Sequence, residues 1–168
     1  AIDTDRFYVI CFNNLGGCFG STGPASPHHE TGEVWRTDFP VLAIEDIAAA
    51  IRQALRQMDL QRIAAVVGPS LGGMTALAYA MAAGDEVGAL AIISSAHRAE
   101  PFAISIHSLQ REAIHSDPAW SAGYYADHLP PAMGMRLARK IGMLSYRSAA
   151  EWAVRFGRER TSGWGNGP

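Results

Sequence analysis

The spacing of apolar positions predicts that strands and helices alternate in the first hundred residues. Three short apolar runs are typical of buried strands, at residues 7–12, 63–67 and 89–94. Residues 44–58 place apolar side chains at helical spacing with charged side chains between them, and residues 74–83 predict a second helix that ends at Gly84. This order of elements predicts βαβ units around a parallel sheet.

The pattern changes after residue 100, where helical spacing recurs and no strand pattern intervenes. Helices are predicted at residues 104–115, 135–143 and 149–156. We therefore expect a partial α/β core at residues 1–100 and a helical cap at residues 101–160. The glycine-rich stretch 161–168 has no periodicity and predicts an unstructured tail.

A long loop rich in glycine separates the first predicted strand from the first predicted helix, at about residues 13–40. Its glycines do not have the spacing of the dinucleotide-binding fingerprint and do not lead directly into a helix. A loop of this length inside a compact domain is usually functional or disordered.

Composition narrows the class of protein. The chain has 168 residues, 48% of them apolar and 18% charged, which suits one folded domain with a core. The net charge is −2 and no block of Lys and Arg occurs, so we expect no nucleic-acid partner. No long uncharged apolar run and no signal-peptide pattern occur, so we expect no membrane association and a cytoplasmic location. Cys11 and Cys18 are too few for a disulfide framework, which favours a reducing compartment.

The sequence Gly-Pro-Ser-Leu-Gly at residues 68–72 is the strongest chemical signal. It follows the G-x-S-x-G pattern and lies between a predicted strand and a predicted helix, which is the context of a nucleophile elbow. Ser70 would stand at the N-terminus of the helix as a nucleophile, and the backbone N–H of Leu71 would donate to an oxyanion. The alternative is an ordinary glycine-rich turn between a strand and a helix.

A serine nucleophile needs a histidine base and an acid that orients it, and in the α/β-hydrolase order both follow the serine on later strands. The candidates after Ser70 follow no further strand: His97, His107, His115, His128, Asp85, Asp117 and Asp127. We therefore expect the catalytic acid and histidine to be absent from this chain. Cys18 has no His or Asp at a supporting spacing, and the pair His28 and His29 lacks further ligands, so no metal site is predicted. Arg111 could bind a carboxylate in a bidentate manner or be a solvated helix charge.

Several blocks in the same order resemble the homoserine O-acyltransferase family of the α/β-hydrolase fold: residues 3–6, 14–18, 20–24, 68–74 and 110–114. The resemblance implies transfer of an acyl group from acyl-CoA to the side-chain hydroxyl of homoserine or serine, through an acyl-serine. It implies acyl-CoA as a co-substrate and no tightly held cofactor, small molecules as partners, and a homodimer through the cap helices in the full-length protein.

Further blocks are most similar to the serine O-succinyltransferase branch, which makes O-succinylserine on a route to cysteine: residues 101–102, 108–114, 134–136, 138–140, 146–149 and 155–158. The resemblance assigns Ser70 as the nucleophile and Arg111 as the group that binds the carboxylate of the amino acid. His107 stands where a succinyl user is expected to carry arginine, and histidine binds a carboxylate well only when protonated, near or below about pH 6.5. The acetyltransferase branch, which serves methionine synthesis, therefore remains open.

The resemblance also implies that this chain is the middle of a longer protein. Family members carry earlier strands, one of which supplies a second oxyanion donor, and a later segment with the Asp and the His. We expect an α/β-hydrolase core that is truncated at both ends and inactive alone. The alternatives are an esterase of the same fold that uses water as the acceptor, and an inactive truncated fragment.

Overall fold

A computed structural model of the chain describes residues 2–126 and 128–157. These residues form two compact units, with the boundary between Ala99 and Glu100. The predicted tail at residues 161–168 and the candidate Asp127 lie outside the described residues.

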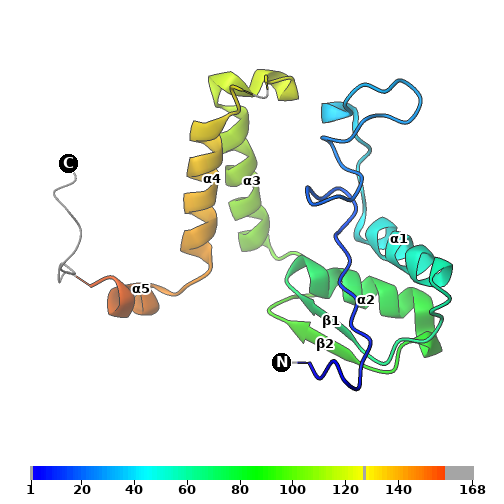
Figure 1. Cartoon of the computed structure of the whole chain (residues 1–168). Helices are drawn as coiled ribbons and strands as arrows, with labels where there is room; N and C mark the ends of the chain where they lie inside the picture. The colour runs from blue at the N-terminus through cyan, green and yellow to red at the C-terminus, as the bar shows by residue number, and fades with distance from the viewer. Residues whose placement is uncertain (1, 127, 158–168) are drawn as a thin grey trace. The chain divides into compact units, whose positions relative to one another are not determined.

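The first unit contains a parallel βαβ arrangement (Figure 1). Strands β1 (Val66–Pro69) and β2 (Leu90–Ile93) pair in register from Val66↔Leu90 to Pro69↔Ile93. Helix α2 (Leu71–Ala83) and the short 3-10 helix η2 (Gly84–Glu86) connect them. The parallel sheet predicted from the sequence is thus confirmed, and α2 begins three residues earlier than the apolar pattern indicated.

Helix α1 (Ile44–Gln57) packs against α2 and builds the core of the first unit. Its amphipathic pattern is confirmed, because Ile47 and Leu55 of the predicted apolar positions are buried; Ala48 is buried beside them. The buried centre of this core comprises Ala48, Leu55, Tyr79 and Ala83. Three charged side chains lie beside this core. The guanidinium of Arg52 is 2.6 Å and that of Arg56 is 3.2 Å from the Glu86 carboxylate. The hydrogen bond from Arg52 lowers the pKa of Glu86 from its ordinary value.

The predicted strand at residues 7–12 is wrong. The described part of the chain contains no strand there, because neither β1 nor β2 pairs with this segment. The apolar pattern has a different cause: Ile10 and Phe12 pack against the α1–α2 core, while Phe7 and Tyr8 are exposed. Alternating burial along an irregular segment produces the same sequence signature as a strand.

The predicted loop is confirmed over residues 13–35. It contains an isolated antiparallel bridge between Pro27 and Val34, and it is followed by the 3-10 helix η1 (Arg36–Asp38). The Trp35 ring contacts the rings of His28, at 4.0 Å, and of Phe39, at 5.8 Å between centroids. Tilted and edge-on ring contacts therefore add to the backbone hydrogen bonds of this segment, such as that from the N–H of Trp35 to the carbonyl oxygen of Ser26.

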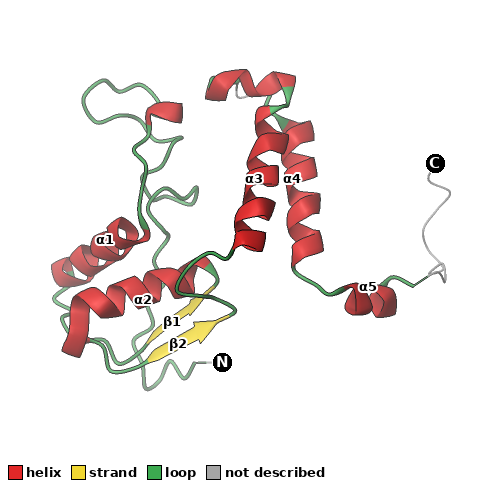
Figure 2. Ribbon diagram, turned by 180° about the vertical axis from the view of Figure 1, so that it is seen from behind, coloured by secondary structure: helices red, strands yellow, loops and turns green. Residues whose placement is uncertain are grey.

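The second unit is helical, as the sequence predicts (Figure 2). It comprises α3 (Pro101–His115), η3 (Pro118–Gly123), α4 (Ala132–Ser145) and α5 (Ala149–Arg155). Helices α3 and α4 lie side by side, and a Cβ at Gly134 would stand 2.4 Å from the carbonyl oxygen of Ala113. Only glycine therefore allows this close approach of the two backbones.

Asp117 joins the end of α3 to the start of α4. Its carboxylate accepts hydrogen bonds from the N–H of Gly134, at 2.8 Å, and from the N–H of Ala119, at 3.0 Å. These two bonds, that of Gly134 first, lower the pKa of Asp117 from its ordinary value. No helix among the described residues is long and apolar enough to cross a bilayer.

Candidate active site

Ser70 is the single residue between the end of β1 and the first residue of α2. Its backbone has φ 50° and ψ −122°, a combination that side-chain-bearing residues rarely adopt. The turn is therefore as abrupt as the G-x-S-x-G pattern predicts, and it sets the serine at the N-terminus of a thirteen-residue helix.

Two glycines make this turn possible, and they are Gly68 and Gly73. A Cβ at Gly68 would stand 2.1 Å from the carbonyl oxygen of Gly72, and a Cβ at Gly73 would stand 2.5 Å from the Cβ of Ser95. A Cβ at Gly72 would meet only the Cδ of Pro69, at an ordinary 3.5 Å. The steric demand at the elbow therefore falls on the first glycine of the motif and on the glycine that follows it, rather than on Gly72.

Pro69 fits the elbow because its nitrogen, which carries no hydrogen, faces away from β2. The N–H of Val66 donates to Ala89 and the N–H of Ser70 donates to Ile93, at 2.9 and 3.0 Å. Donors alternate between the two edges of a strand, so the nitrogen of Pro69 faces the other edge of β1. The β1–β2 ladder therefore loses no hydrogen bond to the proline.

Leu71 is the first residue of α2, and a backbone N–H at this position has no acceptor inside its own helix. The carbonyl of Ser70, in the same peptide unit, accepts from the N–H groups of Gly73, at 2.9 Å, and Met74, at 3.2 Å. It also accepts from the hydroxyl of Ser95, at 2.6 Å. Sequence reasoning missed Ser95, because nothing in its local pattern marks a serine beyond a strand as a neighbour of the elbow.

Among the described residues of the first unit, no histidine or carboxylate forms a hydrogen bond with the Ser70 hydroxyl. His97 follows β2 and is exposed, and His115 stacks on Trp120 with ring centroids 5.1 Å apart. Asp117 holds the α3–α4 connection. Within their own units, His115 and Asp117 thus have ring and backbone partners.

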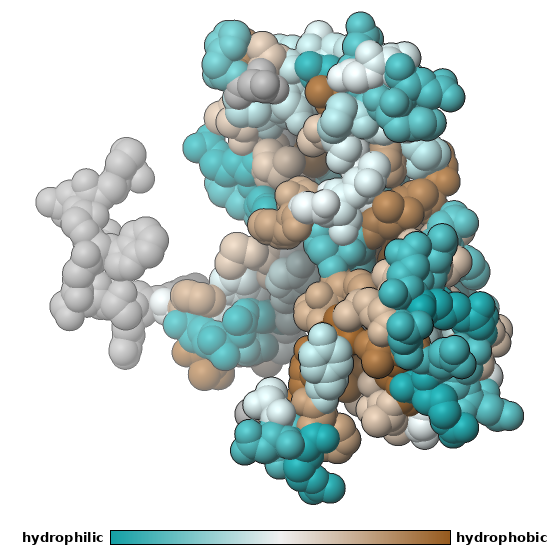
Figure 3. Space-filling view, turned by 45° about the vertical axis from the view of Figure 1, so that its right-hand side comes forward, coloured by the Kyte–Doolittle hydropathy of each residue, from teal (hydrophilic) through white to brown (hydrophobic). Residues whose placement is uncertain are grey.

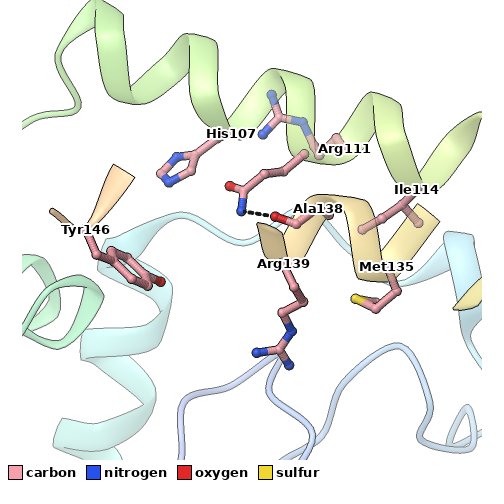
Figure 4. Close-up of a pocket in the computed structure, with 8 residues that line it drawn as sticks. His107, Arg111, Ile114, Met135, Ala138, Arg139 and Tyr146 are labelled. Carbon is pink, nitrogen blue, oxygen red and sulfur yellow. Dashed lines mark hydrogen bonds between the residues drawn. The ribbon is translucent and has the colours of Figure 1, made fainter. Parts of the chain in front are cut away.

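His107 and Arg111 lie one turn apart on α3 and line one groove of the second unit, with a volume of about 420 Å³ (Figure 4). Arg139 and Tyr146 join them from the α4 side, and sequence reasoning missed both. Ile114 and Met135 lie together at one end of the groove, as Figure 4 shows. No Asp or Glu lines this groove, so its charged lining is cationic and suits an anionic group.

Gln110 fixes the wall of the groove, because its side-chain amide donates to the carbonyl oxygen of Ala138 at 3.0 Å (Figure 4). Among the residues that the structure describes, no group of three His, Cys, Asp or Glu side chains could hold a metal ion. Cys11 and Cys18 are exposed free thiols.

The chain belongs to the alpha/beta hydrolase fold family, whose pattern it matches over residues 1–162. Within that fold it is similar to a serine O-succinyltransferase of Litchfieldella anticariensis, with 52% identity over 96% of this chain and 44% of the relative. An L-serine/homoserine O-acetyltransferase of Streptomyces lavendulae is also 52% identical, over 95% of this chain and 42% of the relative.

Solved structures give the same fold. Homoserine O-acetyltransferase from Bacillus anthracis superposes with a TM-score of 0.78 and 27% identity, over 83% of this chain and 37% of that one. An acetylester hydrolase from Corynebacterium glutamicum superposes with a TM-score of 0.73 and 25% identity, over 83% and 41%. The chain spans less than half the length of the relatives that it matches.

Proposed function

We propose that the longer protein containing this chain transfers an acyl group from acyl-CoA to the side-chain hydroxyl of L-serine or L-homoserine, through an acyl-Ser70 intermediate. The observation that carries this proposal is the backbone of Ser70, held at φ 50° between β1 and α2. The names of the similar acyltransferases support the choice of acceptor.

The reaction would proceed in two halves. The Ser70 hydroxyl oxygen attacks the thioester carbonyl, and its proton passes to a histidine base and then to the departing CoA sulfur. The N–H of Leu71 donates to the oxyanion in each tetrahedral intermediate. The amino-acid hydroxyl then attacks the acyl group, and Ser70 regains its proton. The histidine and its orienting acid would come from parts of the protein outside this chain.

The cationic groove of the second unit would bind the charged ends of the substrates. The resemblance assigns Arg111 to the carboxylate of the amino acid. His107, one turn earlier on α3, would face the acyl group and influence whether succinyl or acetyl is taken. The product would be an O-acyl amino acid for cysteine or methionine synthesis.

The test of the nucleophile is the mass of the elbow peptide after exposure of the longer protein to succinyl-CoA or acetyl-CoA without acceptor. We expect the peptide to gain the acyl mass in the wild type and to gain nothing in Ser70→Ala. Ser145→Ala is a matched control, because it removes another serine hydroxyl that bonds a backbone carbonyl, that of Gly142 at 2.8 Å. An acyl adduct that persists in Ser70→Ala would contradict the proposal.

The second candidate is an esterase, which the likeness to the acetylester hydrolase favours. The same elbow would then pass its acyl group to water. Release of CoA that requires added serine or homoserine indicates transfer, and equal release without acceptor indicates hydrolysis.

The KM for the amino-acid acceptor tests the role of Arg111. We expect Arg111→Gln to raise the KM for serine or homoserine about 10- to 100-fold, because a charge-assisted bond to the carboxylate is lost. The KM for acyl-CoA should stay within about twofold. Arg136→Gln, on the exposed surface of α4, is the control. An unchanged acceptor KM would exclude Arg111 from the carboxylate site.

A further inference from the structure

The end of β2 holds both backbone polar groups of Ser70. The carbonyl oxygen of Ile93 accepts the N–H of Ser70 at 3.0 Å, and the hydroxyl of Ser95 donates to the carbonyl oxygen of Ser70 at 2.6 Å. The other two donors to that carbonyl, Gly73 and Met74, belong to α2 itself. Ser95 is thus the contact that fixes this peptide unit relative to the sheet rather than to its own helix.

The orientation of this peptide unit matters because it contains the oxyanion donor. A trans peptide is planar, so the carbonyl of Ser70 and the N–H of Leu71 point in opposite directions. A hydroxyl that fixes the carbonyl on one side therefore fixes the direction of the N–H on the other. Small errors in the direction of such a donor slow the reaction, because its hydrogen bond must point to the position of the oxyanion and not to that of the ground-state carbonyl oxygen.

Two features of the sequence make room for this contact. Gly73 has no side chain, and a Cβ there would stand 2.7 Å from the hydroxyl oxygen of Ser95 and 2.5 Å from its Cβ. Ser94 has φ 48°, an unusual value for a residue with a side chain, at the point where the chain leaves β2. Such backbone strain persists only where the surrounding structure over-determines it.

We propose that Ser95 is a positioning residue for catalysis, whose hydroxyl aims the Leu71 N–H at the oxyanion. This proposal rests on the proposed function, since it assumes that Ser70 is the nucleophile. Gly73, which the G-x-S-x-G pattern does not include, leaves space for the Ser95 hydroxyl to reach the elbow.

The test compares Ser95→Ala, Ser95→Thr and the control Ser145→Ala in the longer protein. We expect Ser95→Ala to lower kcat about tenfold with both KM values within about twofold, because only the transition state loses an interaction. Ser95→Thr keeps the hydroxyl and should recover most of kcat, and Ser145→Ala should match the wild type. A kcat within twofold of wild type in Ser95→Ala, or an equal loss in Ser95→Thr, would overturn the proposal.

A second measurement needs neither acyl-CoA nor turnover. Phenylboronic acid forms a tetrahedral adduct with a nucleophilic serine and places an oxygen at the oxyanion position. We expect its affinity to fall about tenfold in Ser95→Ala, while the melting temperature of each variant is recorded beside it. An unchanged affinity overturns the role of Ser95, whatever happens to stability.

The acylation of Ser70 and the boronate affinity together distinguish a failure of the positioning role of Ser95 from a failure of the acyltransferase proposal. If the wild type acylates at Ser70 and Ser95→Ala acylates equally fast, the inference fails and the function stands. If no acyl group reaches Ser70 but boronate affinity still falls in Ser95→Ala, the acyltransferase proposal fails and the positioning role stands.

Discussion

Two of the six described residues that bear a side chain and have positive φ are serines that follow neighbouring strands. Ser70 follows β1 with φ 50°, and Ser94 follows β2 with φ 48°. Each conformation carries an energetic cost. The cost at Ser70 is offset locally by its hydrogen bonds with Ile93 and Ser95. At the scale of single residues, the site is therefore a pair of turns that support one another.

Asp117 gives a prediction of stability against pH. Its pKa is lowered in the folded state by the N–H groups of Gly134 and Ala119, while an unfolded aspartate titrates at about 3.9. The carboxylate therefore stabilises the fold fully above about pH 4, and this contribution is lost as pH falls through the lower folded-state pKa. We expect Asp117→Asn to lower the melting temperature at pH 7 by a few degrees and to weaken the acid dependence.

The measurement is thermal unfolding between pH 7 and pH 3. The control is Glu112→Gln, because Glu112 is an exposed carboxylate on α3. A variant Asp117→Asn that unfolds at the wild-type temperature at pH 7 would show that the α3–α4 connection does not depend on this carboxylate.

At the scale of elements, the β1–elbow–α2 unit gives a matched pair of glycine substitutions. We expect Gly68→Ala to lower the free energy of unfolding by about 1–3 kcal/mol, because its Cβ would stand 2.1 Å from the carbonyl oxygen of Gly72. Gly72→Ala should change it by less than about 1 kcal/mol, since its Cβ meets only an ordinary contact and alanine favours a helix.

Denaturant unfolding of the two variants in the longer protein tests this difference. Equal losses for Gly68→Ala and Gly72→Ala would mean that the strand and the helix can move apart at the elbow, which the packing described above does not allow.

The helices and strands also show which parts of the fold the sequence could predict. The helices and the elbow were predictable because helical periodicity and a G-x-S-x-G between a strand and a helix are local signals. The strand at residues 7–12 was predicted wrongly, because strand formation depends on a neighbouring strand, which no local pattern contains. Ser95, Arg139 and Tyr146 were missed for a related reason: their neighbours lie far away in the sequence.

At the scale of the whole molecule, many large apolar side chains remain exposed, as Figure 3 shows for one face. Met81 in the first unit is 86% exposed, and Tyr146 in the second is 81% exposed. Large exposed apolar surface is typical of sites where other segments or other chains bind, and of chains prone to aggregation.

We therefore expect the 168-residue chain, made alone, to bind a hydrophobic dye and to transfer acyl groups only at the background rate. The reason for dye binding is the exposed apolar surface. The reason for the low rate is that no histidine or carboxylate among the described residues of the first unit bonds to the Ser70 hydroxyl. Dye fluorescence and CoA release, compared with the longer protein at equal concentration, test this expectation. Turnover of the isolated chain near that of the longer protein would contradict it.

Pro69 has one consequence for solvent. Its nitrogen faces the edge of β1 that β2 does not occupy, one residue before Ser70. Any strand that aligned along this edge would find no backbone donor at that level, and one of its carbonyl groups would need a side chain or a water molecule as its donor. A water molecule bound at that level would supply the missing donor one residue away from Ser70.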